Sequence, residues 1–440
     1  MLSIFISLFC SIFYSKYIEV VILLSLLVPS SICVLYKSNI YLEDVLSTSN
    51  DMNSALIFMA ISLTLLIFLS SWATPDIMYN STLMVLLFIL MMCFSTSNLL
   101  WFYILFESSL LPILFLIVGW GYQPERLQAG LYMILYTVFG SMPLLIIILY
   151  MNHNYCSLNF FLLPMINNLP NFYLTLGFLA FLVKLPVYSL HVWLPKAHVE
   201  APLGGSMILA GVLLKLGGYG MYIYGSLGSW VLTNFGYVFL ISVAMWGGLY
   251  ASLICLSQMD IKSMIAYSSI VHMSLVVLGI MSYTAWGFSC SLITMLAHGW
   301  ASSALFLLAY VTYEKVGSRS FNYTKGMLSV LPVLGYFWFL LAAVNMSVPP
   351  TINLVGELCG IPVAMWMNLG FLLVLLLTLF VSVAYNMYLY TKVNHGPVSM
   401  LMLASNSLHA RGMMAITGHL LPLFFLLSMH LISPCTENCM

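Results

Sequence analysis

Charged residues are scarce in this sequence. Of its 440 residues, 62% are hydrophobic and only 5% are charged, with 12 Lys and Arg against 12 Asp and Glu. Soluble domains carry about 25% charged residues, so this chain has too few to cover a folded core with a polar surface. Lipid is therefore the expected solvent for most of the chain. The balanced charge also argues against a nucleic-acid partner, which requires a basic patch.

Motifs for cofactors and metals are missing as well. The nine cysteines are scattered without a CxxC pair, so we expect no zinc, haem, iron–sulfur or other metal site. The sequence has no dinucleotide-binding glycine motif and no Walker lysine loop, so we expect no binding of NADH, flavin or nucleotide by this chain. Cys435 and Cys439 are close in sequence; free thiols are the simpler interpretation, and a disulfide is the alternative.

A targeting sequence is also absent at the N-terminus. The N-terminus, MLSIFISLFC, has no basic stretch and no small-residue cleavage site, and it is not arginine-rich like a transit peptide. We expect it to be the first membrane span. A chain this hydrophobic without a targeting sequence is expected to be synthesised where it is used, in a bacterium or from an organelle genome.

Long apolar runs fill most of the sequence. A membrane-spanning helix needs about 20 apolar residues, so these runs predict an all-α integral membrane protein with about fourteen transmembrane helices. The expected spans are 2–15, 17–36, 53–71, 80–97, 98–118, 130–151, 172–193, 203–225, 230–256, 262–281, 284–312, 328–356, 362–390 and 412–432.

The basic residues support this division into spans. Loops after odd-numbered spans hold nine Lys and Arg residues, whereas loops after even-numbered spans hold only Lys37. The positive-inside rule places the odd loops in the matrix or cytoplasm. With an even number of spans, both termini are expected on the opposite side, which is the intermembrane space in a mitochondrion.

Two spans contain helix breakers at matching positions. Pro186 follows Lys184 in the seventh span, and Pro349 and Pro350 lie in the twelfth. In lipid, the carbonyls freed by a proline are satisfied where a broken helix lines a polar cavity. Broken spans five apart indicate two inverted repeats of five helices. The expected units are 1–79 with the first three helices, 80–225 and 226–390 with the two repeats, and 391–440 with the last helix and tail.

Six ionisable residues interrupt the apolar runs. They are Glu107, Lys184, Lys215, His272, His298 and Glu357. A charge at the bilayer centre costs about 2.5–3.5 kcal/mol on insertion scales, so such residues usually serve a function. Burial favours the neutral form of lysine and of carboxylate, and a charged partner opposes this effect. The sequence therefore predicts a chain of buried groups that gain and lose protons.

Each of these residues also has a structural interpretation. A buried Glu–Lys pair can simply hold helices together, and a histidine can bond a neighbouring helix. Glu357 lies near the expected end of its span, so an interfacial position is the alternative to a buried one. His191 follows Lys184 by seven residues and would share its face on an unbroken helix. His198 and Glu200 are expected at the membrane interface.

The segments around these residues resemble a known family. Segment 184–220, KLPVYSLHVWLPKAHVEAPLGGSMILAGVLLKLGGYG, is similar to the signature of the proton-translocating membrane subunits of complex I and their Mrp-type antiporter relatives. Four further segments resemble the subunit 4 members: GWGYQPERLQAG (119–130), DIKSMIAYSSIVHMSLV (260–276), AHGWASSALF (297–306) and VPPTINLVGELCG (348–360). The resemblance extends from about Leu99 to Tyr390.

The resemblance implies roles for the buried residues. Glu107 and Lys184 match a glutamate–lysine pair, and Lys215 matches the central lysine of the eighth helix. His272 and His298 match relay positions toward a second half-channel. The remaining candidates for proton translocation are Glu357, which matches the acidic residue of the broken twelfth helix, and His191.

The resemblance also implies a function and its setting. The chain is expected to be a proton-translocating subunit in the membrane arm of complex I, in the mitochondrial inner membrane. NADH, FMN, iron–sulfur clusters and ubiquinone are expected to be handled by other subunits, so this enzyme subunit performs no redox chemistry and holds no cofactor. Its expected partners are the other membrane-arm subunits, including neighbouring antiporter-like subunits, and membrane lipids. An Mrp-type cation/proton antiporter subunit and a structural scaffold with inert ion pairs are the alternatives.

Overall fold

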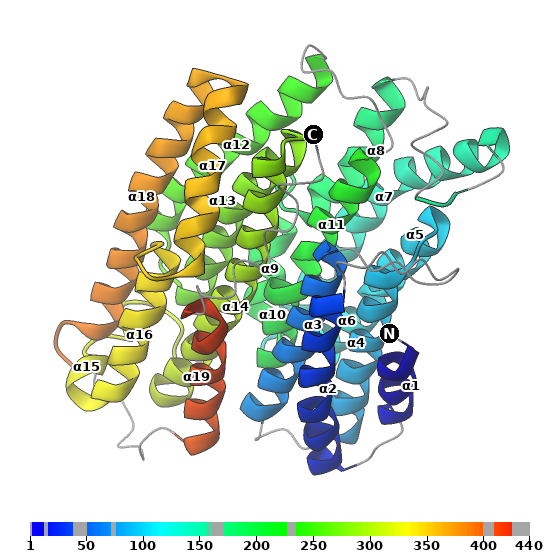
Figure 1. The fold of residues 1–440 in the computed structure, drawn as a ribbon. Coiled ribbons are helices and arrows are strands. Elements are labelled where there is room, and N and C mark those ends of the chain that lie inside the picture. The colour runs from blue at the N-terminus through cyan, green and yellow to red at the C-terminus, as the bar shows by residue number, and fades with distance from the viewer. Residues whose placement is uncertain are drawn as a thin grey trace.

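The fold consists of helices packed side by side. A computed structural model describes residues 2–12, 16–37, 51–71, 76–155, 158–160, 171–226, 235–398 and 409–424. Within these ranges the regular elements are helices and no β-strand is formed. Most of the helices run up or down the height of the molecule (Figure 1). The expected all-α architecture is confirmed.

The helices of the first half of the chain are α1 (Leu2–Ser11), α2 (Tyr17–Lys37), α3 (Asp51–Ser70), α4 (Ile77–Ser95), α5 (Leu99–Ser108), α6 (Leu110–Trp120), α7 (Arg126–Tyr155), α8 (Asn171–Lys184), α9 (Trp193–Glu200), α10 (Leu203–Ile208), the π-helical turn η2 (Leu209–Leu213) and α11 (Leu214–Gly225). Those of the second half are α12 (Phe235–Ser257), α13 (Ile261–Met281), α14 (Ala285–Val316), α15 (Met327–Val330), α16 (Pro332–Asn345), α17 (Ile352–Met367), α18 (Leu369–Asn394) and α19 (Ala410–Phe424).

Many of these helices have the length and composition of membrane spans. In the described part of the chain, ten helical segments are long and apolar enough to cross a membrane. Of three shorter apolar helices, α8 and α16 belong to the predicted broken spans, and α17 extends from the twelfth predicted span into the thirteenth. The chain is therefore a multi-pass membrane protein, and the count of about fourteen spans stays a prediction.

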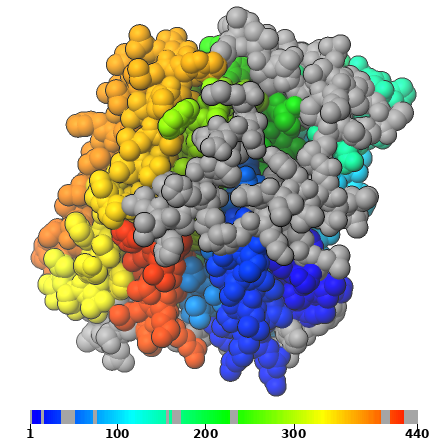
Figure 2. Space-filling view, in the orientation of Figure 1, coloured from blue at the N-terminus to red at the C-terminus, as the bar shows by residue number. Residues whose placement is uncertain are grey.

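Large apolar side chains form much of the outer surface. Phe139 on α7 is 83% exposed, Phe380 on α18 is 75% exposed and Leu26 on α2 is 69% exposed. Figure 2 shows the side chains of α2 and α18 on one outer face of the molecule. Such a surface is unfavourable in water and favourable in hydrocarbon, since lipid tails are as apolar as these side chains.

The central helices are buried on all sides. In the most apolar stretch of α14, 100% of the residues are buried. In those of α13 and of the α10–η2–α11 segment, 94% of the residues are buried. α13 and α14 pack along each other, and α14 also contacts α17 and η2. These central helices carry Lys215, His272 and His298, so the fold itself places those three residues away from both lipid and water.

Both predicted helix breaks are present. α8 ends at Lys184 before the short helix α9, and α16 ends at Asn345 before α17. Each break contains a serine in the left-handed region, Ser189 with φ 86° and Ser347 with φ 62°. Non-glycine residues rarely adopt this conformation, and they do so mainly at turns and functional sites. The boundaries of the two predicted repeats stay a prediction.

The twelfth and thirteenth spans differ from their predicted boundaries. α17 continues beyond the predicted end at 356, and α18 begins only after Asn368. The Asn368 side chain caps α18 by accepting a hydrogen bond from the Gly370 amide, whereas Pro362 is accommodated inside α17. Glu357 consequently lies well inside α17 and is buried, so the interfacial alternative for this residue is wrong.

Candidate functional site

Lys215 lies at the centre of the bundle. Its side chain is 0% exposed. Its Nζ donates a hydrogen bond to the Ala210 carbonyl at 2.6 Å and lies 3.0 Å from Nδ1 of His298. The π-helical turn η2 directly precedes Lys215, and its wider hydrogen-bonding pattern brings a backbone carbonyl within reach of the lysine. The lysine is thus held by one carbonyl and one imidazole.

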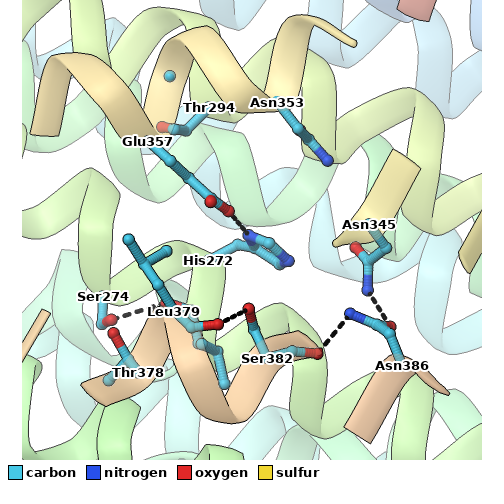
Figure 3. Close-up of polar contacts among 12 residues, drawn as sticks. His272, Ser274, Thr294, Asn345, Asn353, Glu357, Thr378, Leu379, Ser382 and Asn386 are labelled. Carbon is cyan, nitrogen blue, oxygen red and sulfur yellow. Dashed lines mark hydrogen bonds and ion pairs between the residues drawn. The ribbon is translucent and has the colours of Figure 1, made fainter. Parts of the chain in front are cut away.

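A row of titratable side chains continues from Lys215. The ring centroids of His298, on α14, and His272, on α13, are 5.3 Å apart. Nδ1 of His272 lies 3.8 Å from Oε1 of Glu357, on α17. Figure 3 shows the Glu357 carboxylate pointing at the His272 ring. The structure therefore joins four of the seven predicted site residues into one buried row across α11, α14, α13 and α17.

The histidines of this row have unused hydrogen-bonding capacity. Nε2 of His298 and Nε2 of His272 are buried and form no hydrogen bond in the described part of the chain. Most buried polar groups in proteins are paired, because leaving one unpaired costs about 1–3 kcal/mol. A scaffold of inert polar contacts would not be expected to retain two such unpaired atoms. The unpaired nitrogens favour proton transfer over a purely structural role.

Glu107 and Lys184 lie next to each other but are not paired in this structure. Nζ of Lys184 donates to the Phe106 carbonyl at 2.7 Å and lies 3.1 Å from the centre of the Phe106 ring. Oε1 of Glu107 is buried and has no hydrogen-bond partner among the described residues. The lysine therefore contacts the residue that precedes Glu107, and a carboxylate oxygen is left unsatisfied beside it.

His191 lies apart from the row. It follows the end of α8, so it does not share a helix face with Lys184. Its ring stacks on Tyr188 with 4.9 Å between the centroids and contacts the edge of Tyr267 at 5.7 Å. The structure records no contact between the His191 side chain and the other predicted site residues. Its role in proton translocation stays a prediction.

His198 and Glu200 are buried inside the protein, and their expected position at the membrane interface stays a prediction. They lie on α9, which packs against α7 and α13. The His198 ring stacks on Phe306 with 4.7 Å between centroids, and neither ring nitrogen has a hydrogen-bond partner in the described chain. Burial, and then the positive charges of Lys262 and Lys215, lower the pKa of His198 to about 3. His198 is therefore neutral at physiological pH.

A cavity of about 180 Å³ opens beside these residues. Glu200 accepts a hydrogen bond from Arg319 at 3.2 Å, and its other carboxylate oxygen is buried without a partner among the residues that the structure describes. Arg319 also lies 3.5 Å from Asp260, and Lys262 donates to the Val199 carbonyl at 3.3 Å. The lining residues are Glu125, Gln128, Ala129, Pro195, Lys196, Val199, Glu200 and Arg319.

Sequence reasoning missed two charged residues that the fold brings to Val199 and Glu200. Lys262 and Arg319 counted only as loop cations in the positive-inside comparison, since each follows a span without any unusual motif. The available signal was the grouping of Lys196, His198 and Glu200 in the short run WLPKAHVEAP. The fold brings Lys262 and Arg319 to that run from two other helix ends.

Comparison with known proteins identifies the family. A family described as NADH:quinone oxidoreductase/Mrp antiporter, transmembrane, matches residues 95–383. The NADH-ubiquinone oxidoreductase chain 4 of Albinaria caerulea is 44% identical over 383 residues, covering 86% of this chain and 87% of the relative. The chain 4 protein of Aedes aegypti is 48% identical over 328 residues, covering 74% and 73%.

Solved structures share the fold at lower identity. Respiratory complex I from Thermus thermophilus with bound NADH contains a chain that is 20% identical, with a TM-score of 0.85 over 96% of this chain and 94% of that one. A chain of the Mrp complex from Dietzia sp. DQ12-45-1b is 17% identical, with a TM-score of 0.81 over 90% and 79%. The chain described here belongs to the NADH-ubiquinone oxidoreductase chain 4 family.

Proposed function

We propose that this chain is a proton-translocating subunit in the membrane arm of mitochondrial complex I. The observation that carries the proposal is the buried row from Lys215 through His298 and His272 to Glu357. Chain 4 membership supports the assignment to the NADH-ubiquinone oxidoreductase. Electron transfer from NADH to ubiquinone, with its FMN and iron–sulfur clusters, belongs to other subunits in this proposal.

Proton movement along the row follows from the contacts. Lys215 directs its ammonium at a ring nitrogen of His298, so a proton can pass from nitrogen to nitrogen over 3.0 Å. Histidine has two ring nitrogens that can each bind and release a proton, which suits it to relay between lysine and carboxylate. The 5.3 Å between the two rings requires a ring rotation or a bridging water. Glu357 then receives the proton and releases it toward the intermembrane space.

Glu107 and Lys184 are the proposed control point. Lys184 lies against the Phe106 carbonyl, one residue from the unsatisfied carboxylate of Glu107. A small movement of α5 or of the α8 end would form the ion pair or separate it. Pairing favours the charged lysine and separation favours the neutral one, since burial disfavours unpaired charge. A neighbouring antiporter-like subunit would supply the movement.

Protons would enter through the loop-side cavity. Its cations, Lys196 and Arg319, belong to the loops that the positive-inside rule places in the matrix. Glu200 lines this cavity, and His198, two residues before it, lies close enough to Lys262 and Lys215 for both charges to act on its ring. We propose that protons pass from the cavity by way of these residues toward Lys215. In this orientation both chain termini face the intermembrane space.

Replacing His298 in the assembled complex tests the proposed function. His298→Gln removes the ring that accepts from Lys215, so proton pumping in sealed vesicles should fall at least about tenfold. NADH–ubiquinone turnover should fall with it if the two processes are coupled. The matched control is His419→Gln, because His419 is also fully buried but lies on α19, and its one hydrogen bond among the described residues is to the Ala415 carbonyl. Full pumping by an assembled His298→Gln complex would refute the proposal.

A further inference from the structure

Two buried asparagines lie beside His272, on the side away from Glu357. Asn345 is the last residue of α16 and Asn386 lies on α18, and each is 2% exposed. Nδ2 of Asn345 donates to Oδ1 of Asn386 at 2.9 Å. Nδ2 of Asn386 in turn donates to the Ser382 carbonyl at 3.0 Å. Figure 3 shows the two amides in series, leading from α18 to the break at the end of α16.

The orientation of both amides follows from the last acceptor in the series. The Ser382 carbonyl can only accept, so the Asn386 atom facing it must be the amide nitrogen. The amide oxygen of Asn386 then faces Asn345, which must present its own nitrogen. The remaining Asn345 atom is therefore its amide oxygen. In Figure 3 this oxygen points toward the His272 ring.

The His272 ring thus lies between two different partners. Glu357 faces Nδ1, and Nε2 is the ring nitrogen without a hydrogen bond among the described residues. An amide oxygen only accepts, so it favours a proton on the ring nitrogen that it faces. The partner of one ring nitrogen decides which tautomer a histidine adopts.

We propose that the Asn345–Asn386 pair fixes the tautomer of His272, with hydrogen on Nε2 directed at Asn345 and Nδ1 left free to exchange a proton with Glu357. This inference rests on the proposed function and assigns both asparagines as positioning residues. In the transfer step the Nδ1–H bond of the doubly protonated ring breaks and an O–H bond forms on the Glu357 carboxylate. The products are a neutral ring that keeps its Nε2 proton and a neutral carboxyl group.

The break between α16 and α17 makes this orientation movable. Asn345 is the last helical residue before the break, while Asn353 ties the two sides together by donating to the Val344 carbonyl at 2.9 Å. A shift at the break would carry the Asn345 oxygen toward or away from His272. The pair thereby connects the conformation of the broken helix to the proton exchange with Glu357.

Two substitutions of Asn345 with opposite electrostatic effects test the inference in the assembled complex. Asn345→Leu removes the acceptor, so pumping-coupled turnover should fall about tenfold and its half-maximal pH should move lower. Asn345→Asp places a carboxylate beside the ring and stabilises the doubly protonated form, so the half-maximal pH should move higher. Asn386→Leu should resemble Asn345→Leu with a smaller effect, and the double variant should be no worse than Asn345→Leu, since Asn386 acts through Asn345.

Asn353→Leu is the control for damage to the break. It removes a hydrogen bond at the same place and should leave the half-maximal pH unchanged. Equal pH profiles for Asn345→Leu and Asn345→Asp would overturn the tautomer assignment, even if both variants lose activity. If His298→Gln abolishes pumping while the asparagine variants keep the parent pH profile, only this inference fails. If His298→Gln pumps fully, the proposed function itself fails.

Discussion

The proposed proton transfer depends on single buried residues. Lys215, His272, His298 and Glu357 were recognisable from sequence because an ionisable side chain in an apolar run is costly to bury. Their mutual distances could not be predicted from sequence, since each residue comes from a different helix and packing sets the rotation of each helix. His198 shows most clearly what could not be predicted from the sequence. Its sequence context predicted a position at the membrane interface but did not predict that α9 packs against α7 and α13, where His198 is 0% exposed.

The burial of His198 predicts an acid-sensitive fold. Its pKa is about 3 in the folded protein, below its ordinary value of 6.5. Between these values the unfolded chain binds more protons than the folded one, so stability falls as the pH falls from about 6.5 toward 3. The contribution lost between pH 7 and pH 5 is about 2 kcal/mol.

His198→Gln removes this titration while keeping a neutral polar side chain. Thermal inactivation of the assembled complex should therefore depend less on pH in the variant than in the parent between pH 7 and pH 5. An identical pH dependence in both proteins would show that His198 is not held neutral by burial.

At the scale of helices, interruptions determine the site geometry. The prolines predicted both breaks, because proline cannot continue a helix without losing a hydrogen bond. The start of α18 was not predicted, because Asn368 as a cap competes with Pro362 as a breaker and only the packed structure decides between them. The π-helical turn before Lys215 has no sequence signal comparable to a proline, yet it sets the position of that lysine.

Close contact between α8 and α11 holds Lys184 in place. A methyl group on Gly217 would lie 3.0 Å from the Leu185 nitrogen and 3.1 Å from the Phe181 carbonyl oxygen, both backbone atoms near the end of α8. Gly217→Ala should therefore displace this helix end and destabilise the protein by about 1–3 kcal/mol. The reduced amount of assembled complex on a native gel would report the effect.

Gly119 on α6 offers a matched control. A methyl group there would meet no atom within 4 Å, so Gly119→Ala should assemble like the parent. Normal assembly of the Gly217→Ala variant, with unchanged turnover, would show that the α8–α11 contact is more adaptable than the structure indicates.

For the whole molecule, composition predicted the solvent correctly. The outward-facing apolar side chains of α2, α7 and α18 make sense only against lipid. The all-helical architecture also followed from the long apolar runs, whereas the exact number of spans did not, because several segments are short or broken. The orientation in the membrane is inferred from the distribution of basic residues along the whole sequence.

Cysteine labelling tests that orientation. Asn322 lies in the loop after α14 and Asn368 lies between α17 and α18, and both are exposed. The connection from α14 to α15 and the connection from α17 to α18 lie at opposite ends of the bundle in Figure 1. A membrane-impermeant thiol reagent applied from the matrix side should label Asn322→Cys and not Asn368→Cys, after subtraction of labelling in the parent. The reverse pattern would invert the proposed direction of proton transfer.

The most direct test of the account is proton pumping by a Lys215→Ala complex in sealed vesicles, with assembly checked on a native gel. Lys215 contacts His298 at 3.0 Å and begins the row that leads to Glu357, so its loss should interrupt every proposed transfer. The account predicts normal assembly with pumping and NADH–ubiquinone turnover both sharply reduced. Normal assembly with full turnover and full pumping would mean that Lys215 is structural and that protons do not pass along this row.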